Sequence, residues 1–189
     1  MKKMRDRSFV GMLVLALFAL VSPLAAADKS EDQLISDLDS KNEDTVVSAM
    51  LKLEKLYPTS TKAFPTMKKM LTDSRSKVRR KSARVLGILH AEVNDDDLKA
   101  ISALLKASDI QEVMDGLKSL RGLKAQKTVP EILPLLKSST PNVVRDACRT
   151  LAVLGDKSHI PAIEPLLTHS VAAVKLDAQD AIFQLKAKP

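Results

Sequence analysis

The side chains that most often perform catalysis or bind metals are sparse in this sequence of 189 residues. The histidines are His90, His159 and His169, and none is followed by a glutamate. Metal sites need several donors at regular spacing, whereas these histidines are dispersed. The sequence also has no glycine-rich phosphate loop, no Gly-x-Ser-x-Gly motif and no cysteine pair. We therefore expect no catalytic residues, no metal, no cofactor and no small-molecule substrate.

Cys148 is the only cysteine, so the chain cannot form an internal disulfide. It follows the small residue Ala147, at the position that Ala83 and Leu117 hold in other copies of a repeat described below. A catalytic thiolate would need a histidine and a positive environment, and no histidine is close in sequence. We expect Cys148 to be a buried packing residue, which is the usual place of a free cysteine.

Charged residues recur more regularly and suggest a surface that binds a partner. Six cations and one methionine form this candidate surface: Arg80, Lys81, Arg84, Met114, Lys118, Arg145 and Arg149. Such a group of cations would attract an acidic segment of a partner protein, and the methionine would add an apolar contact. The alternative is a solvated face on which Arg and Asp of neighbouring copies pair. The sequence leaves both interpretations open.

These residues belong to a repeat whose second helix can be counted in five copies. A large apolar residue marks each copy at Leu53, Leu86, Leu120, Leu151 and Ile182, and these markers are 31 to 34 residues apart. Three residues later a leucine follows at Leu56, Leu89, Leu123, Leu154 and Leu185. Four residues earlier stands a small residue, Ala49, Ser82, Gly116, Ala147 or Ala178. The i, i+3 spacing indicates one helical face, and the small residue permits close approach of a neighbouring helix.

The first helix of a copy ends in a pair of apolar residues, as at Leu135-Leu136. Pro65, Pro130 and Pro161 suit the first turn of this helix, whereas Pro134 and Pro165 should bend it. The predicted helices cover residues 31–38, 43–57, 62–72, 76–90, 95–106, 110–124, 128–137, 141–154, 158–168 and 171–186. Stacked helix pairs make an all-α solenoid of about five antiparallel pairs, because each pair covers the apolar face of the next.

Second helices usually line the concave side of such a stack, which predicts an outward stripe along them. The stripe consists of Val47, Ser48, Leu51, Arg80, Lys81, Arg84, Met114, Asp115, Lys118, Arg145, Asp146, Arg149, Leu176, Asp177 and Asp180. It is apolar in the first copy, basic in the middle and acidic in the last.

The repeat resembles the HEAT repeat, in the short bacterial form related to the HEAT-like repeats of bilin lyases. Copy two carries the resemblance best, through Phe64-Pro65, Met67, Met70-Leu71, Asp73, Val78-Arg79, Ala83 and Leu86-Gly87. The resemblance covers residues 30–187 and implies that Asp73 and Arg79 link adjacent repeats, although copies three to five lack this pair. It also implies an alternative function as an enzyme or enzyme-associated subunit of the HEAT-like lyase type.

Residues 1–27 have the pattern of a bacterial export signal, with a basic N-terminal region, an apolar run over 9–21 and Ala25-Ala26-Ala27 at the expected cleavage site. Cleavage after Ala27 would leave a domain of residues 28–189 in the periplasm or outside the cell, with no membrane span. An uncleaved anchor is the alternative, although the run is shorter than the about 20 residues of a spanning helix. Residues 28–189 hold 26 Lys and Arg against 22 Asp and Glu, so nucleic-acid binding is not expected.

The sequence therefore predicts a noncatalytic scaffold. We expect it to bind an acidic segment of a partner protein on the concave face that its second helices form.

Overall fold

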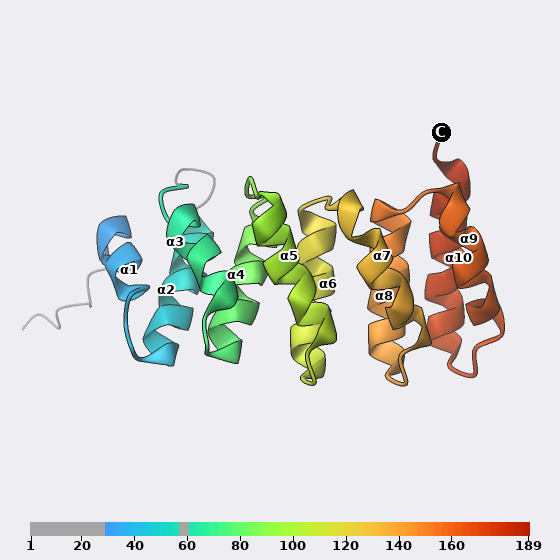
Figure 1. Ribbon diagram of the computed structural model, residues 1–189, viewed down its shortest axis with the longest axis horizontal. Coiled ribbons are helices and arrows are strands. Elements are labelled where there is room, and N and C mark those ends of the chain that lie inside the picture. The colour runs from blue at the N-terminus through green and yellow to red at the C-terminus, as the bar shows by residue number, and fades with distance from the viewer. Residues whose placement is uncertain (1–28, 57–60) are drawn as a thin grey trace, which may run out of the picture.

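The computed structural model describes residues 29–56 and 61–189 (Figure 1). Ten α-helices follow one another in this part of the chain: α1 (Glu31–Asp37), α2 (Glu43–Leu56), α3 (Phe64–Lys69), α4 (Ser76–Ile88), α5 (Asp95–Ala103), α6 (Ile110–Gly122), α7 (Val129–Ile132), α8 (Pro141–Leu154), α9 (Ile160–Ile163) and α10 (Ala172–Ala187). The described residues contain no strand. None of their helices is long and apolar enough to cross a membrane. The predicted signal segment lies outside the described residues.

The helices form five pairs that stand side by side along one axis (Figure 1). The odd-numbered member of each pair is helix A and the even-numbered member is helix B. The B helices contact one another in order, α2 with α4, α4 with α6, α6 with α8 and α8 with α10. This arrangement confirms the predicted all-α solenoid of five helix pairs.

The predicted apolar positions make up the core between the two layers. All five marker residues are buried, and so are the small residues four positions before them. The close B-helix contacts follow from these small residues, because each removes side-chain bulk where a neighbour packs. Leu56 departs from the prediction with 37% exposure. It is the last residue of α2, so no further helical turn lies beside it.

Most A helices change into a 3-10 helix before they end. The 3-10 segments that end A helices are η1 (Met70–Thr72), η2 (Leu104–Lys106), η4 (Leu133–Lys137) and η6 (Glu164–Thr168). Two more, η3 (Gln126–Thr128) and η5 (Lys157–His159), directly precede α7 and α9. In copies four and five the change comes after only four α-helical residues, just before Pro134 and Pro165. Proline cannot donate the hydrogen bond that would continue an α-helix. The predicted disturbance of these two helices is therefore present as an early 3-10 segment.

Capping residues mark the starts of α5 and α8. Asn94 caps α5, since its side chain accepts from the Asp97 backbone N–H at 2.8 Å. Thr140 is the N-cap of α8, and Pro141 takes the first helical position. Three acidic residues in the first turn of α5 suit the positive end of that helix. Capping therefore explains where these two helices begin.

The helices α4 and α6 approach closely near their C-terminal ends. A Cβ atom on Gly87 would lie 2.6 Å from the Cα atom of Ser119, and one on Gly122 would collide with the carbonyl oxygen of Gly87. His90 and Lys124, each directly after the C-cap residue of its helix, have positive φ values of 49° and 52° and end the two helices in a left-handed turn. The Nδ1 atom of His90 lies 2.7 Å from the carbonyl oxygen of Gly122 and bridges the two ends.

Candidate protein-binding surface

The structure places all seven predicted binding residues on three successive B helices, α4, α6 and α8. We call the side of the B layer that carries them the helix-B face. Arg84 and Arg149 are exposed, and the other five are half-buried. Met114 also packs against the hydrophobic core, so only part of its side chain remains for a partner.

Four of the six cations pair with an aspartate on the next B helix. The N–O distances are 3.1 Å for Arg80 and Asp115, 4.0 Å for Lys118 and Asp146, 2.6 Å for Arg145 and Asp177, and 2.9 Å for Arg149 and Asp177. We call this series the charge ladder. Each aspartate lies five residues before the marker of its own copy, so the pairs recur with the repeat.

The aspartates of the charge ladder are not on the outward stripe, contrary to the sequence prediction. Asp115, Asp146 and Asp177 are 8%, 4% and 7% exposed. Each faces the preceding B helix, whose cations cover it. Two arginines on one aspartate supply hydrogen bonds to both carboxylate oxygens of Asp177. Removing the cations would leave the aspartates buried and uncompensated, so the pairs favour this arrangement of neighbouring helices.

Copy two departs from the charge ladder. It has Lys81 at the position of the aspartates, and α2 has Val47 and Leu51 at the two positions that supply the cations of the ladder in copies two to four. Lys81 and Arg84 form no ion pair and no hydrogen bond with any residue that the structure describes. Burial lowers the pKa of Lys81, and the neighbouring Arg84 guanidinium lowers it further. The more distant carboxylates of Glu54 and Asp115 act in the opposite direction and raise this pKa. The helix-B face thus holds on α4 two cations that lack a direct ion pair within the described residues.

Asp73 and Arg79 both take part in links between adjacent repeats, as the resemblance implies. The links are made through two further residues, Arg75 and Glu112, that the resemblance does not include. The carboxylate of Asp73 binds Arg75 at 2.8 Å, which lowers the pKa of Asp73. Arg75 also donates to the Ser40 carbonyl of copy one at 3.0 Å. Arg79 binds Glu112 of copy three at 2.8 Å and the backbone carbonyl of Asp73. Sequence reasoning missed Arg75 and Glu112, since neither belongs to the recurring pattern.

The structure confirms the burial of Cys148, whose side chain is 0% exposed. Burial raises the pKa of the thiol to about 12, and the negative charge of Asp177 contributes to the increase. A thiol with this pKa is not a nucleophile at neutral pH, because the reactive form is the thiolate.

The histidines lie at helix ends and contact backbone groups, His90 across two helices and the other two locally. His159 lies next to Asp156 and Ser158 and completes the cap of a 3-10 segment. The Oδ1 atom of Asp156 accepts from the Ser158 backbone N–H at 2.8 Å, which lowers the pKa of Asp156. His169 accepts from the Val171 backbone N–H at 3.0 Å. Among the described residues no three His, Cys, Asp or Glu side chains gather to hold a metal ion.

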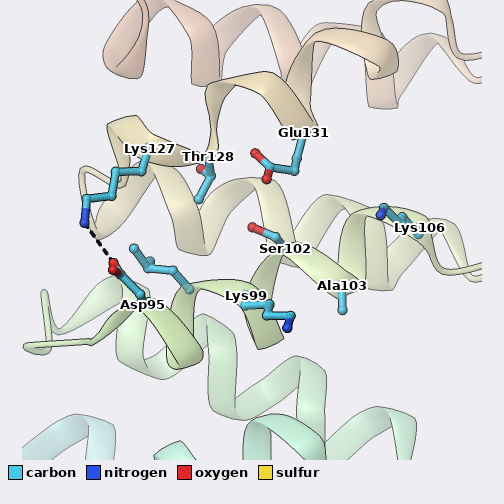
Figure 2. Close-up of a pocket in the computed structure, with 9 residues that line it drawn as sticks. Asp95, Lys99, Ser102, Ala103, Lys106, Lys127, Thr128 and Glu131 are labelled. Atoms are coloured by element: carbon cyan, nitrogen blue, oxygen red, sulfur yellow. Dashed lines mark hydrogen bonds and ion pairs between the residues drawn. The ribbon is translucent and has the colours of Figure 1, made fainter.

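A pocket of about 460 Å³ lies on the helix-A side, between α5 and the start of α7 (Figure 2). Lys127 reaches across it to Asp95, with an Nζ–Oδ1 distance of 2.9 Å. Lys99, Lys106 and Glu131 also line it, so charges of both signs surround an open hollow. This pocket was not predicted, because its residues come from two copies and share no repeat position.

The structure is similar to solved α-solenoids, although no family model and no curated protein sequence matches the chain significantly. One is a chain in the complex of CpcE and CpcF of phycocyanin lyase from Nostoc sp. PCC7120, with a TM-score of 0.73 and 22% identity over 87% of this chain and 68% of that chain. Another is a designed armadillo repeat protein in complex with the peptide (KR)4, with a TM-score of 0.62 and 17% identity over 80% of each chain. These similarities support a HEAT-like repeat fold.

Proposed function

We propose that the protein is a noncatalytic scaffold of the bacterial periplasm or cell exterior, which binds an acidic segment of a partner protein on its helix-B face. The observation that carries this proposal is that Lys81 and Arg84 form no ion pair with a described residue, whereas the other four cations of the predicted surface are paired with aspartates. An acidic partner would supply the missing charge.

Two further observations support a role in protein binding. Solenoids present long surfaces whose side chains are not needed for the core, and the exposed residues of the helix-B face are of this kind. The armadillo repeat protein similar to this chain was solved with a bound peptide, and CpcE was solved with CpcF. The buried Cys148 and the histidines at helix ends offer no catalytic arrangement within the described residues.

The experiment that tests the binding face is capture of a partner from the cell envelope by immobilised protein. We expect Lys81→Ala with Arg84→Ala to lose the partner. The control is Lys99→Ala with Lys106→Ala, which removes two exposed cations from the helix-A side. Circular dichroism should show unchanged helical content in both variants. Loss of the partner only in the helix-A variant would contradict the proposed face.

Export is tested separately. The signal pattern at Ala25-Ala26-Ala27 leads us to expect Asp28 at the N-terminus of the exported protein, as measured by mass spectrometry. An intact Met1 in the membrane fraction would instead indicate an anchored scaffold.

The second candidate is an enzyme or enzyme-associated subunit of the HEAT-like lyase type, favoured by the similarity to the phycocyanin lyase complex. It predicts that the captured partner is a catalytic subunit and that adding this protein raises its activity. A partner whose activity does not change on addition would favour the noncatalytic scaffold.

A further inference from the structure

The interruption of the charge ladder lies beside two exposed apolar side chains. Ile88 follows Arg84 by one helical turn on α4 and is 44% exposed. Leu51 is 42% exposed and holds on α2 the position that Arg84 holds on α4. Since α2 and α4 pack against each other and Leu51 and Arg84 hold the same repeat position, we infer that these residues and Lys81 belong to one patch. We call Leu51, Lys81, Arg84 and Ile88 the α2–α4 patch.

The rest of the helix-B face does not offer the same combination. Arg145 and Arg149 on α8 share Asp177, and Lys118 on α6 faces Asp146. On α10 the corresponding positions hold Leu176 and Asp180, so the last copy adds no cation. An acidic ligand would have to displace existing ion pairs on α6 and α8, whereas it would meet unpaired cations on α4.

We propose that an acidic protein segment with interspersed large apolar residues docks on the α2–α4 patch, and that one of its carboxylates binds Lys81 and Arg84, which form no ion pair with a described residue. This proposal rests on the proposed function and narrows it to one site and one class of ligand. Carboxylate binding by Arg84 and the half-buried Lys81 is charge-assisted, and it compensates a positive charge that burial disfavours. Leu51 and Ile88 lose contact with water when apolar ligand side chains cover them.

The test uses three fluorescein-labelled octapeptides and the purified protein, with binding measured by fluorescence anisotropy. The peptides are (Glu-Leu)4, (Glu)8 and (Lys-Leu)4. We expect (Glu-Leu)4 to bind most tightly, (Glu)8 to bind more weakly, and (Lys-Leu)4 not to bind. Added salt should weaken the binding of (Glu-Leu)4, because its carboxylates meet exposed cations. Equal binding of (Glu-Leu)4 and (Lys-Leu)4 would overturn the proposal.

The chain provides a matched pair of variants. Arg84 and Arg149 are both exposed and both lie two residues before their marker, but only Arg149 has an aspartate partner. Arg84→Ala should raise the Kd for (Glu-Leu)4 at least about tenfold, because one charge-assisted contact is lost. Arg149→Ala should leave this Kd within about twofold of the wild-type value. Leu51→Ser with Ile88→Ser should reduce the affinity for (Glu-Leu)4 to that for (Glu)8.

Two results would overturn this inference in different ways. Equal weakening by Arg84→Ala and Arg149→Ala would place the ligand on the whole helix-B face and leave the proposed function standing. Absence of (Glu-Leu)4 binding to the wild-type protein would remove the proposed ligand class, and the envelope capture would then decide separately whether the face binds a protein.

Discussion

Gly87 and Gly122 show how single residues set the distance between neighbouring copies. Alanine at an interior helical position is usually about 1 kcal/mol more favourable than glycine. Gly122→Ala should have the opposite effect, because its Cβ would collide with the carbonyl oxygen of Gly87. We expect a loss of about 1–3 kcal/mol in the free energy of unfolding, the usual cost of overpacking. Urea denaturation measures it, with the exposed Lys186→Ala as control. A Gly122→Ala variant as stable as wild type would contradict the close approach.

Cys148 should make the stability of the protein fall at high pH. Its pKa of about 12 lies above the usual value of 9.0, because the folded state buries the thiol. Above pH 9 the unfolded chain loses the thiol proton while the folded chain keeps it, so unfolding becomes easier as pH rises toward 12. The effect is about 1.4 kcal/mol per pH unit.

The measurement compares the stability of the wild-type protein with that of Cys148→Ala. Alanine is a suitable replacement because copy two has Ala83 at the same repeat position. Denaturation at pH 7.5 and 10.5 should show that wild type loses about 2 kcal/mol more than the variant, from the 1.5 pH units above pH 9. Equal losses would mean that the thiol is accessible in the folded protein.

At the residue scale, sequence reasoning found the positions of the cations and, as its alternative interpretation, their pairing with aspartates of neighbouring copies, but it did not find that these aspartates are buried. Arg80, Lys118 and Arg145 stand at the predicted places, yet each is paired with an aspartate about one repeat later. The repeat spacing puts both residues on B helices, but the sequence cannot give the distance between two helices. The prediction that the aspartates face outward was wrong for this reason.

At the scale of the elements, the marker residues join neighbouring copies. Leu120 on α6 is 0% exposed. Leu120→Ala should lower the free energy of unfolding by about 2–5 kcal/mol, because it leaves a cavity in the middle of the stack. Lys127→Ala removes only an exposed ion pair and should change it by less than about 1 kcal/mol. Chemical denaturation compares the two, and equal effects would mean that the repeat alignment of copy three is wrong.

Helix positions were largely predictable, because the 3.6-residue period continues through every copy. The predicted ranges 110–124 and 141–154 differ from α6 and α8 by two residues or less at either end. The 3-10 segments were not predicted where no proline occurs, as at Met70–Thr72 and Leu104–Lys106. There the hydrogen-bond pattern tightens at the helix end, which apolar spacing alone does not reveal.

At the scale of the whole molecule, ion pairs connect each copy to the next. Lys77 binds Glu43 at 3.1 Å between copies one and two, and Lys68 lies 3.5 Å from Asp97 between copies two and three. Contacts of this kind make stability depend on nearest neighbours, as expected of a solenoid. The end copies should then open more readily than the central ones, since each has one neighbour.

Asp177 is the main polar link to the last copy. Asp177→Asn should lower the free energy of unfolding by about 1–3 kcal/mol. This loss is smaller than for a fully buried ion pair, because the arginine partners of Asp177 are partly exposed to solvent. Hydrogen exchange should speed up in α10 more than in α4. Asp180→Asn, on the same helix, is exposed and makes no ion pair with a described residue, so it should have little effect. Faster exchange throughout the chain would contradict a local link.

The charge ladder gives the stack a direction, because cations point forward along the chain and aspartates point back. Copy four carries both halves, with Asp146 toward copy three and Arg145 and Arg149 toward copy five. A tandem duplicate of residues 126–156 would therefore meet itself with complementary charges at the new junction. Its arginines would still face Asp177 in copy five. The protein should accept such a duplication and lengthen by one helix pair. A duplicate of copy five would instead place Leu176 and Asp180 opposite Asp177, so the new junction would lack a cation for this aspartate.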